Sequence, residues 1–232
     1  MKDSPTFKSV IMVGVCLLAL WGCGSLSPIE PVAPGVHEEI DRRCRAHFLH
    51  RPWQLVQAIT AYTPDGEVQN AIGVIRMYPG EERIQCVITS VEGIVLFDGE
   101  YDQKTVIRRG IGPFADETFA NTLFDDIRLV FFHPDEPADV AGQTSSEAPV
   151  CRYERGDGFV EVLFSADRQR EIKRYNTLKK LRKTIHACYE ARCSRHITEA
   201  TEEIPAKLTI SHHGLLEYRL ELELIDAKKL PP

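Results

Sequence analysis

Strict alternation between apolar and charged side chains near the end of the chain is the feature that most restricts its fold. Over residues 216–224, apolar residues occupy every even position and charged residues occupy every odd position. Because successive side chains of a β-strand point to opposite faces, this segment has one dry face and one wet face. The pattern predicts a strand of an antiparallel sheet that curves around a core or a cavity.

Upstream segments share this period of two and are separated by turn-forming residues. The segments 64–66 and 79–80 contain the Pro and Gly residues that tight turns favour. The expected strands are residues 53–62, 68–78, 83–90, 94–97, 129–132, 159–164, 171–175 and 183–189. Short strands joined by such turns favour an antiparallel meander. The polar segment 133–149 is expected to be a long loop.

Two segments have the character of helices. Residues 37–50 form a charged stretch that ends before a proline. Residues 116–126 begin a second helix, in which Phe119, Leu123 and Ile127 recur at intervals of four. This spacing places their side chains in one apolar stripe that must pack against another element.

The chain begins with a segment typical of export. Lys2 and Lys8 precede an apolar run over 10–21, which suits a signal peptide and is too short to span a bilayer. The run ends in Leu-Trp-Gly-Cys, which resembles a bacterial lipobox and predicts that Cys23 is lipidated after removal of residues 1–22. An ordinary secretory peptide with an incidental cysteine is the alternative.

The residue after Cys23 and the prolines beyond it suggest where the protein lies. Gly24 is not the Asp that resembles an inner-membrane retention signal, so we expect the periplasmic face of the outer membrane. Prolines recur at every third position from 28 to 34, so residues 23–36 are expected to be a lipid-anchored, proline-rich spacer of up to ~40 Å. Residues 37–232 remain as a single periplasmic domain.

Export changes the interpretation of the cysteines because the periplasm is oxidising. Five remain in the mature domain, namely Cys44, Cys86, Cys151, Cys188 and Cys193. An odd number leaves at least one thiol free or paired between chains. Cys188 and Cys193 are the nearest candidates for a disulfide, although a helical turn between them would point their side chains apart.

Charge restricts the partners of the protein. The net charge of −6 argues against general nucleic-acid binding. Residues 168–183, in contrast, contain eight Lys and Arg residues and one acid, Glu171. This basic run either faces anionic lipid headgroups or balances Glu217, Glu221 and Glu223 across the sheet.

No known catalytic motif is visible. The sequence lacks a Gly-x-Ser-x-Gly elbow, a His-Glu-x-x-His pair, a phosphate loop and a dinucleotide fingerprint. Cys44, His47 and His50 are metal-ligand types, but on a helix they spread around the surface and lack a fourth ligand. We therefore expect no catalytic residue, metal or cofactor, and an enzyme acting on an envelope substrate is the third and least favoured interpretation.

Three segments carry a family resemblance by the order and pattern of their elements: the strands of residues 84–97, the helix and strand of 119–132, and the pair of strands over 208–224. Together with the lipobox they resemble the LolB-like outer-membrane lipoproteins, which have a LolA/LolB-type fold. The resemblance implies a mainly β protein with helices (α+β), built as an open, curved antiparallel half-barrel with a helical lid.

The resemblance also implies a function. The half-barrel would bind an apolar ligand, such as an acyl chain, a lipid or a lipoprotein, and take part in lipid or lipoprotein transfer. Its cavity would be lined by Phe119 and Leu123 of the lid and by Tyr218, Leu220 and Leu222 of the sheet. The alternative is a non-catalytic tethered scaffold, filled by its own side chains, that recruits a protein partner in the envelope.

Overall fold

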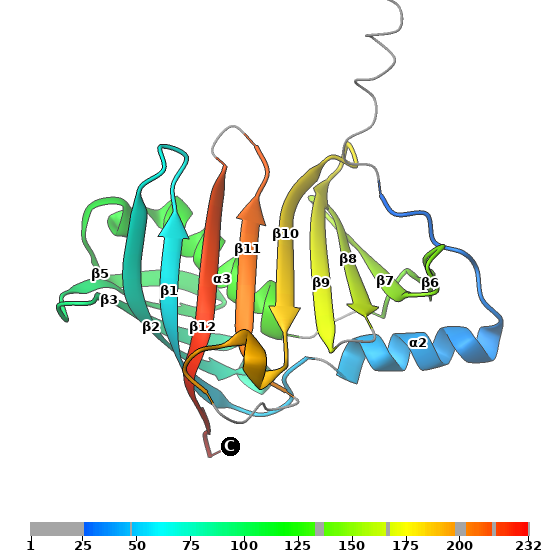
Figure 1. The fold of residues 1–232 in the computed structure, drawn as a ribbon, viewed down its shortest axis with the longest axis horizontal. Helices are drawn as coiled ribbons and strands as arrows, with labels where there is room; N and C mark the ends of the chain where they lie inside the picture. Colours follow the sequence, from blue (N-terminus) through cyan, green and yellow to red (C-terminus); the bar gives the residue numbers. More distant parts are fainter. Residues whose placement is uncertain are drawn as a thin grey trace, which may run out of the picture.

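A single antiparallel sheet dominates the fold. The computed structural model describes residues 26–46, 48–132, 137–165, 168–197, 203–214 and 217–231. Within them, twelve strands lie in the order β5-β4-β3-β2-β1-β12-β11-β10-β9-β8-β7-β6, and the sheet bends at both sides around helix α3 (Figure 1). This architecture confirms the predicted fold class, a mainly β protein with an open, curved antiparallel sheet and helices.

The strands form two meanders. The first comprises β1 (Trp53–Tyr62), β2 (Val68–Tyr78), β3 (Arg83–Ser90), β4 (Val95–Asp102) and β5 (Lys104–Gly110). The second comprises β6 (Val140–Gln143), β7 (Pro149–Arg155), β8 (Gly158–Ser165), β9 (Gln169–Asn176), β10 (Leu181–Cys188), β11 (Lys207–His212) and β12 (Tyr218–Lys229).

The two meanders meet where β1 pairs with β12, in the middle of the sheet (Figure 1). The pairing runs from Trp53 opposite Lys229 to Tyr62 opposite Arg219. The alternation that predicts the last strand continues in the structure: Leu224 is buried on the concave face, and Leu220 and Leu222 pack against the same core. Position 216, where the predicted strand begins, lies outside the described residues.

Helix α3 (Glu117–Phe131) lies across the concave face of the sheet. Asp116 begins the helix, because its side chain accepts hydrogen bonds from the backbone N–H groups of Thr118 and Phe119. The predicted strand over 129–132 is wrong. Val130 and Phe131 continue the buried helical stripe begun by Phe124 and Ile127, so the helix does not end at 126.

Helix α2 (Pro34–Ala46) covers the other end of the sheet, where it packs on β6 and β7. It begins and ends earlier than the predicted helix over 37–50. Its buried side chains include Ile40 and Cys44. Three shorter 3₁₀ segments, Pro79–Glu81, Gly112–Ala115 and Ala191–Cys193, connect strands or precede α3. In the described part of the chain, no helix is long and apolar enough to cross a bilayer.

Some strands have no counterpart among the predicted elements. These are β5, β6 and β7. The segment expected as a long loop contains β6, a strand of four residues, and the start of β7. Residues 133–136 of that segment lie outside the described residues.

The described part of the expected spacer lies against the sheet. Glu30 forms a β-bridge with Gln143 of β6, and the Arg152 guanidinium of β7 donates a hydrogen bond of 2.6 Å to the Ser27 carbonyl. Gly142 permits this approach, because a Cβ at that position would lie 2.5 Å from the Glu30 carbonyl oxygen. Residues 27–30 therefore do not act as a free spacer.

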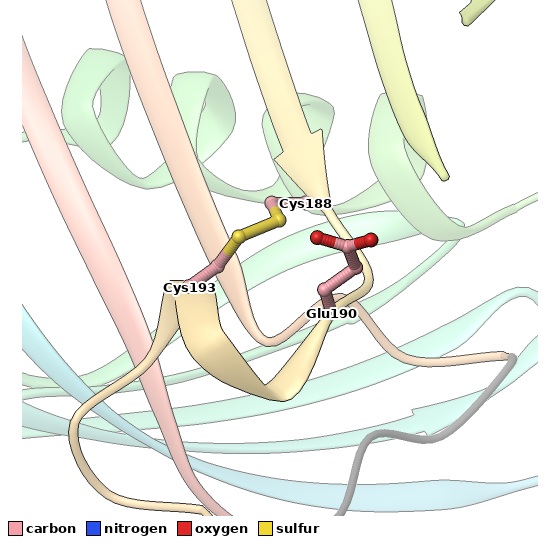
Figure 2. Close-up of side chains that lie close together, drawn as sticks. All are labelled: Cys188, Glu190 and Cys193. Carbon is pink, nitrogen blue, oxygen red and sulfur yellow. A yellow bond between two sulfur atoms is a disulfide. The ribbon is translucent and has the colours of Figure 1, made fainter. Parts of the chain in front are cut away.

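Two disulfides link parts of the domain. Cys44 of α2 is bonded to Cys151 of β7, and Cys188 is bonded to Cys193, the pair considered from the sequence (Figure 2). A 3₁₀ turn, rather than an α-helical turn, brings Cys193 back to the end of β10. Cys86 is buried with a free thiol, and burial raises its pKa to about 12.

Candidate functional site

A cleft of about 170 Å³ opens between the C-terminal half of α3 and the concave face of β7, β8 and β9. We call it the α3 cleft. Its apolar lining consists of Phe48, Leu129, Phe132, Tyr153, Val160 and Val162, and its charged lining of Glu82, Asp125, Arg128, Arg155, Asp157 and Arg174. Hydrophobic walls with several charged groups suit a ligand that has both an apolar and a polar part.

Strand alternation provides the apolar wall of the cleft. Val160 and Val162 of β8 point toward α3, whereas Glu161 between them points to the opposite face. The Glu161 carboxylate is fully buried there, where it pairs with Arg152 and accepts a hydrogen bond of 3.1 Å from the Tyr175 hydroxyl. The wall is thus apolar on one side and fixed by a buried polar network on the other.

The charged residues of the cleft largely pair with one another. A guanidinium nitrogen of Arg128 lies 3.8 Å from a Glu82 carboxylate oxygen, and Arg174 forms an ion pair with Asp157. With three arginines and three acids, the lining has no net charge. The cleft therefore offers both donors and acceptors to a polar headgroup without a strong preference for either sign.

Tyr153 lies in the wall of the cleft and is 3% exposed. Burial, followed by the nearby Asp41 carboxylate, raises its pKa to about 12, so the phenol keeps its proton at neutral pH. In the described part of the chain its hydroxyl oxygen has no hydrogen-bond partner. Tyr153 is therefore a packing residue of the wall and offers no general base.

A buried ion pair joins α3 to the sheet behind the cleft. Lys183 of β10 donates to Asp126 of α3, and both side chains are buried. Burial raises the pKa of the Asp126 carboxyl, which Lys183 and Arg174 oppose. Removing one partner of such a pair leaves a buried, uncompensated charge, so the pair holds α3 in one position.

The five residues expected at a ligand cavity do not line the α3 cleft. Phe119 and Leu123 pack against the core, and the Phe119 ring lies 5.6 Å from the ring of Phe97. Leu220 and Leu222 pack against the same core, and Tyr218 stacks on His212. The N-terminal half of α3 thus packs its half-buried apolar side chains against the core, and a role of these five residues at a ligand cavity stays a prediction.

The basic run of residues 168–183 is divided by the fold. On the strands, Lys173 pairs with Glu171 at 2.9 Å, and Arg174 and Lys183 have the carboxylate partners described above. Arg170 is fully buried and donates a hydrogen bond of 2.7 Å to the Val130 carbonyl.

Two carboxylates of β12, those of Glu221 and Glu223, pair with basic residues outside the run 168–183. Glu221 pairs with Lys207 and Arg219, and Glu223 pairs with Arg195 and Lys207. The basic run and the last strand therefore do not balance each other through these two carboxylates.

The disulfides also bear on metal binding. Ligand atoms of Cys188, Glu190 and Cys193 lie within 4.8 Å of one another (Figure 2). Because the two sulfurs are bonded to each other, neither is the thiolate that a metal requires. The sulfur of Cys44 is likewise bonded to Cys151, and His47 lies outside the described residues.

Sequence reasoning did not identify the residues of the cleft, which come from α3, from the consecutive strands β7, β8 and β9, and from the distant residues Phe48 and Glu82. The available signal was the alternation of Val160 and Val162 around Glu161 within a predicted strand. No spacing in the sequence indicated that Arg128 and Leu129 belong to a helix that faces these two valines.

Comparisons with known proteins give similarities of structure only. No family model matches the sequence, and no curated protein matches it. The structure is similar to that of a LolA superfamily protein from Nitrosomonas europaea, at 11% sequence identity and a TM-score of 0.47, over 84% of this chain and 94% of that chain. It is also similar to a DUF1329 family protein from Desulfovibrio piger, at 8% identity and a TM-score of 0.45, over 84% and 92% of the two chains. Both similarities concern the structure alone, and neither shows the expected resemblance to LolB-like lipoproteins in particular.

Proposed function

We propose that this protein is a non-catalytic binding protein of the bacterial envelope that holds one apolar chain of an amphiphile in the α3 cleft. The observation that supports the proposal is the cleft itself, whose apolar walls are not filled by the protein's own side chains. The apolar end of the ligand would contact Leu129, Val160 and Val162, and its polar end would lie among the charged residues. Lipidation of Cys23 would hold the protein at the periplasmic face of the outer membrane.

The size of the cleft limits the ligand. A volume of 170 Å³ corresponds to about six water molecules, and so to a similar number of methylene groups. At ~0.8 kcal/mol for each fully buried methylene, such a chain gains at most about 5 kcal/mol, so the dissociation constant is no tighter than about 0.3 mM. The cleft thus suits the end of one acyl chain. Transfer of a lipoprotein with several acyl chains would require α3 to move away from the sheet.

The filled part of the concave face supports the alternative, a scaffold that recruits a protein partner. Phe97, Phe119 and Phe124 occupy the space between α3 and the first meander, where a larger ligand would otherwise lie. The two functions differ in one measurable respect, because only the first requires reversible binding of an apolar molecule.

Binding of a fluorescent medium-chain fatty acid to the full chain tests the proposal. Val160→Phe would fill the space of two or more methylene groups of the ligand. The loss of their burial removes ~1.6 kcal/mol of binding free energy and weakens binding about tenfold. Val106→Phe is the matched control, since Val106 lies on β5 and is 44% exposed. Absence of displaceable probe binding to the unmodified protein would refute the carrier function and favour the scaffold.

A further inference from the structure

The hairpin between β9 and β10 has an exposed apolar tip surrounded by basic side chains. Leu178 is 84% exposed, the largest exposed fraction among the large apolar residues of the described chain. Lys179, Lys180 and Arg182 beside it are exposed as well. Within the described residues, these three side chains form no ion pair, unlike the basic residues on the neighbouring strands. We call residues 176–182 the basic hairpin.

Basic side chains outnumber acidic ones around the basic hairpin. The sequence contains no acidic residue between Glu171 and Glu190. The adjacent turn between β7 and β8 contributes Arg155 and Asp157, and Asp157 is already paired with Arg174. On the other side, the connection between β11 and β12 contributes one exposed acid, Glu217, against the three basic side chains of the hairpin. An exposed lysine pair beside an exposed leucine is suited to a surface with a negatively charged layer over an apolar interior, such as an anionic bilayer.

The course of the N-terminal segment brings this end of the sheet close to the lipid anchor. Ser27 is held by Arg152 and by the hydroxyl of Tyr175, the residue directly before the basic hairpin. Four residue steps separate Ser27 from Cys23, and an extended chain spans at most ~14 Å over that distance. A lipid attached to Cys23 would therefore keep the hairpin end of the sheet near the bilayer.

We propose that the basic hairpin docks on an anionic phospholipid surface, with Leu178 in the interface and Lys179, Lys180 and Arg182 among the headgroups. This inference rests on the proposed lipidation of Cys23, which brings the hairpin within reach. Each basic side chain near an anionic surface raises the association constant for that surface about fivefold. Docking would also turn the rim residues Arg155 and Asp157 of the α3 cleft toward the membrane, where an acyl chain could enter.

Quenching of tryptophan by brominated phosphatidylcholine tests the orientation in the full chain reconstituted in vesicles. Leu178→Trp places the reporter at the hairpin, and Arg192→Trp places a matched, exposed reporter in the 3₁₀ turn beyond the other end of β10. Strand β10, whose eight residues span about 23 Å, lies between the two positions. The fluorescence of the two native tryptophans, Trp21 wherever residues 1–22 are retained and the buried Trp53, is subtracted with the unmodified protein.

We expect quenching of Trp at 178 but not at 192 in vesicles that contain phosphatidylglycerol. The double variant Lys179→Ala, Lys180→Ala should weaken docking about 25-fold and so abolish most of this quenching. Fatty-acid binding in the cleft should be unchanged. Equal quenching at both positions, no quenching at 178, or the same quenching in pure phosphatidylcholine would overturn the proposal. A blue-shifted Trp at 178 in detergent without vesicles would also overturn it, since a protein or second copy would then cover the tip. Failure of the anchor is distinguishable, because the chain would then not associate with vesicles of pure phosphatidylcholine, which the basic hairpin does not bind.

Discussion

The disulfide between Cys44 and Cys151 should be the covalent link on which stability depends most. It closes a loop of 107 residues and ties α2 to β7, whereas the Cys188–Cys193 disulfide spans only 5 residues. Loop-closure entropy predicts a contribution of about 4.8 kcal/mol from the long link and about 2 kcal/mol from the short one. Both cysteines of the long link are fully buried, so packing lost on their replacement adds to the difference.

Thermal unfolding followed by circular dichroism can measure this difference. For a domain of this size ~1 kcal/mol corresponds to ~2–4 °C, so Cys44→Ala with Cys151→Ala should lower Tm by about 10–19 °C. Cys188→Ala with Cys193→Ala is the matched control and should lower Tm by about 4–8 °C. If the long-link variant is no less stable than the control, then α2 is not fixed to β7 as the structure has it.

Other predictions concern the core, pH and the anchor. Phe124→Ala should lower the free energy of unfolding by about 3–5 kcal/mol in urea titrations, because this ring is 1% exposed and packs among other aromatic rings. The hydrogen bond from Lys207 holds the pKa of the Glu221 carboxyl below 4.5. The carboxylate should therefore stabilise the fold above pH 4.5, and this stabilisation should be lost as the pH falls further. Glu221→Gln should remove that part of the pH dependence of Tm. Cys23→Ser should abolish metabolic labelling with a fatty acid, and label that persists would contradict lipidation at this residue.

The sheet was predictable wherever one face of a strand is buried and the other is wet. The segments 53–62, 68–78 and 83–90 have this alternation, and they coincide with β1, β2 and β3. β5 has no fully buried residue and carries charges at its ends, so its sequence resembles a surface loop. Its strand conformation comes from pairing with β4, which no local pattern reveals.

Short apolar runs were ambiguous, and this affected the candidate site. The run Leu129–Val130–Phe131 suits a strand as well as a helix; in the structure it is the last turn of α3, because Val130 and Phe131 share a stripe with Phe124. The cleft depends on this difference, since Arg128 and Leu129 face β8 only when the helix continues. The docking of Ser27 and Glu30 could not be predicted either, because it depends on the missing side chain of Gly142.

Pairing of β1 with β12 has a consequence for how the chain is made. The sheet's final edges are protected: β5 carries Lys104, Arg108 and Arg109, and β6 has four residues and is partly covered by Glu30. The edge of β1 has no such protection until β12, which lies more than ~150 residues later in the sequence, reaches it. Contacts between elements so far apart in sequence form late in folding. A chain that stops before residue 218 would thus leave the ten-residue strand β1 as an open template for pairing between molecules, and arrival of the last strand is the step that ends this aggregation risk.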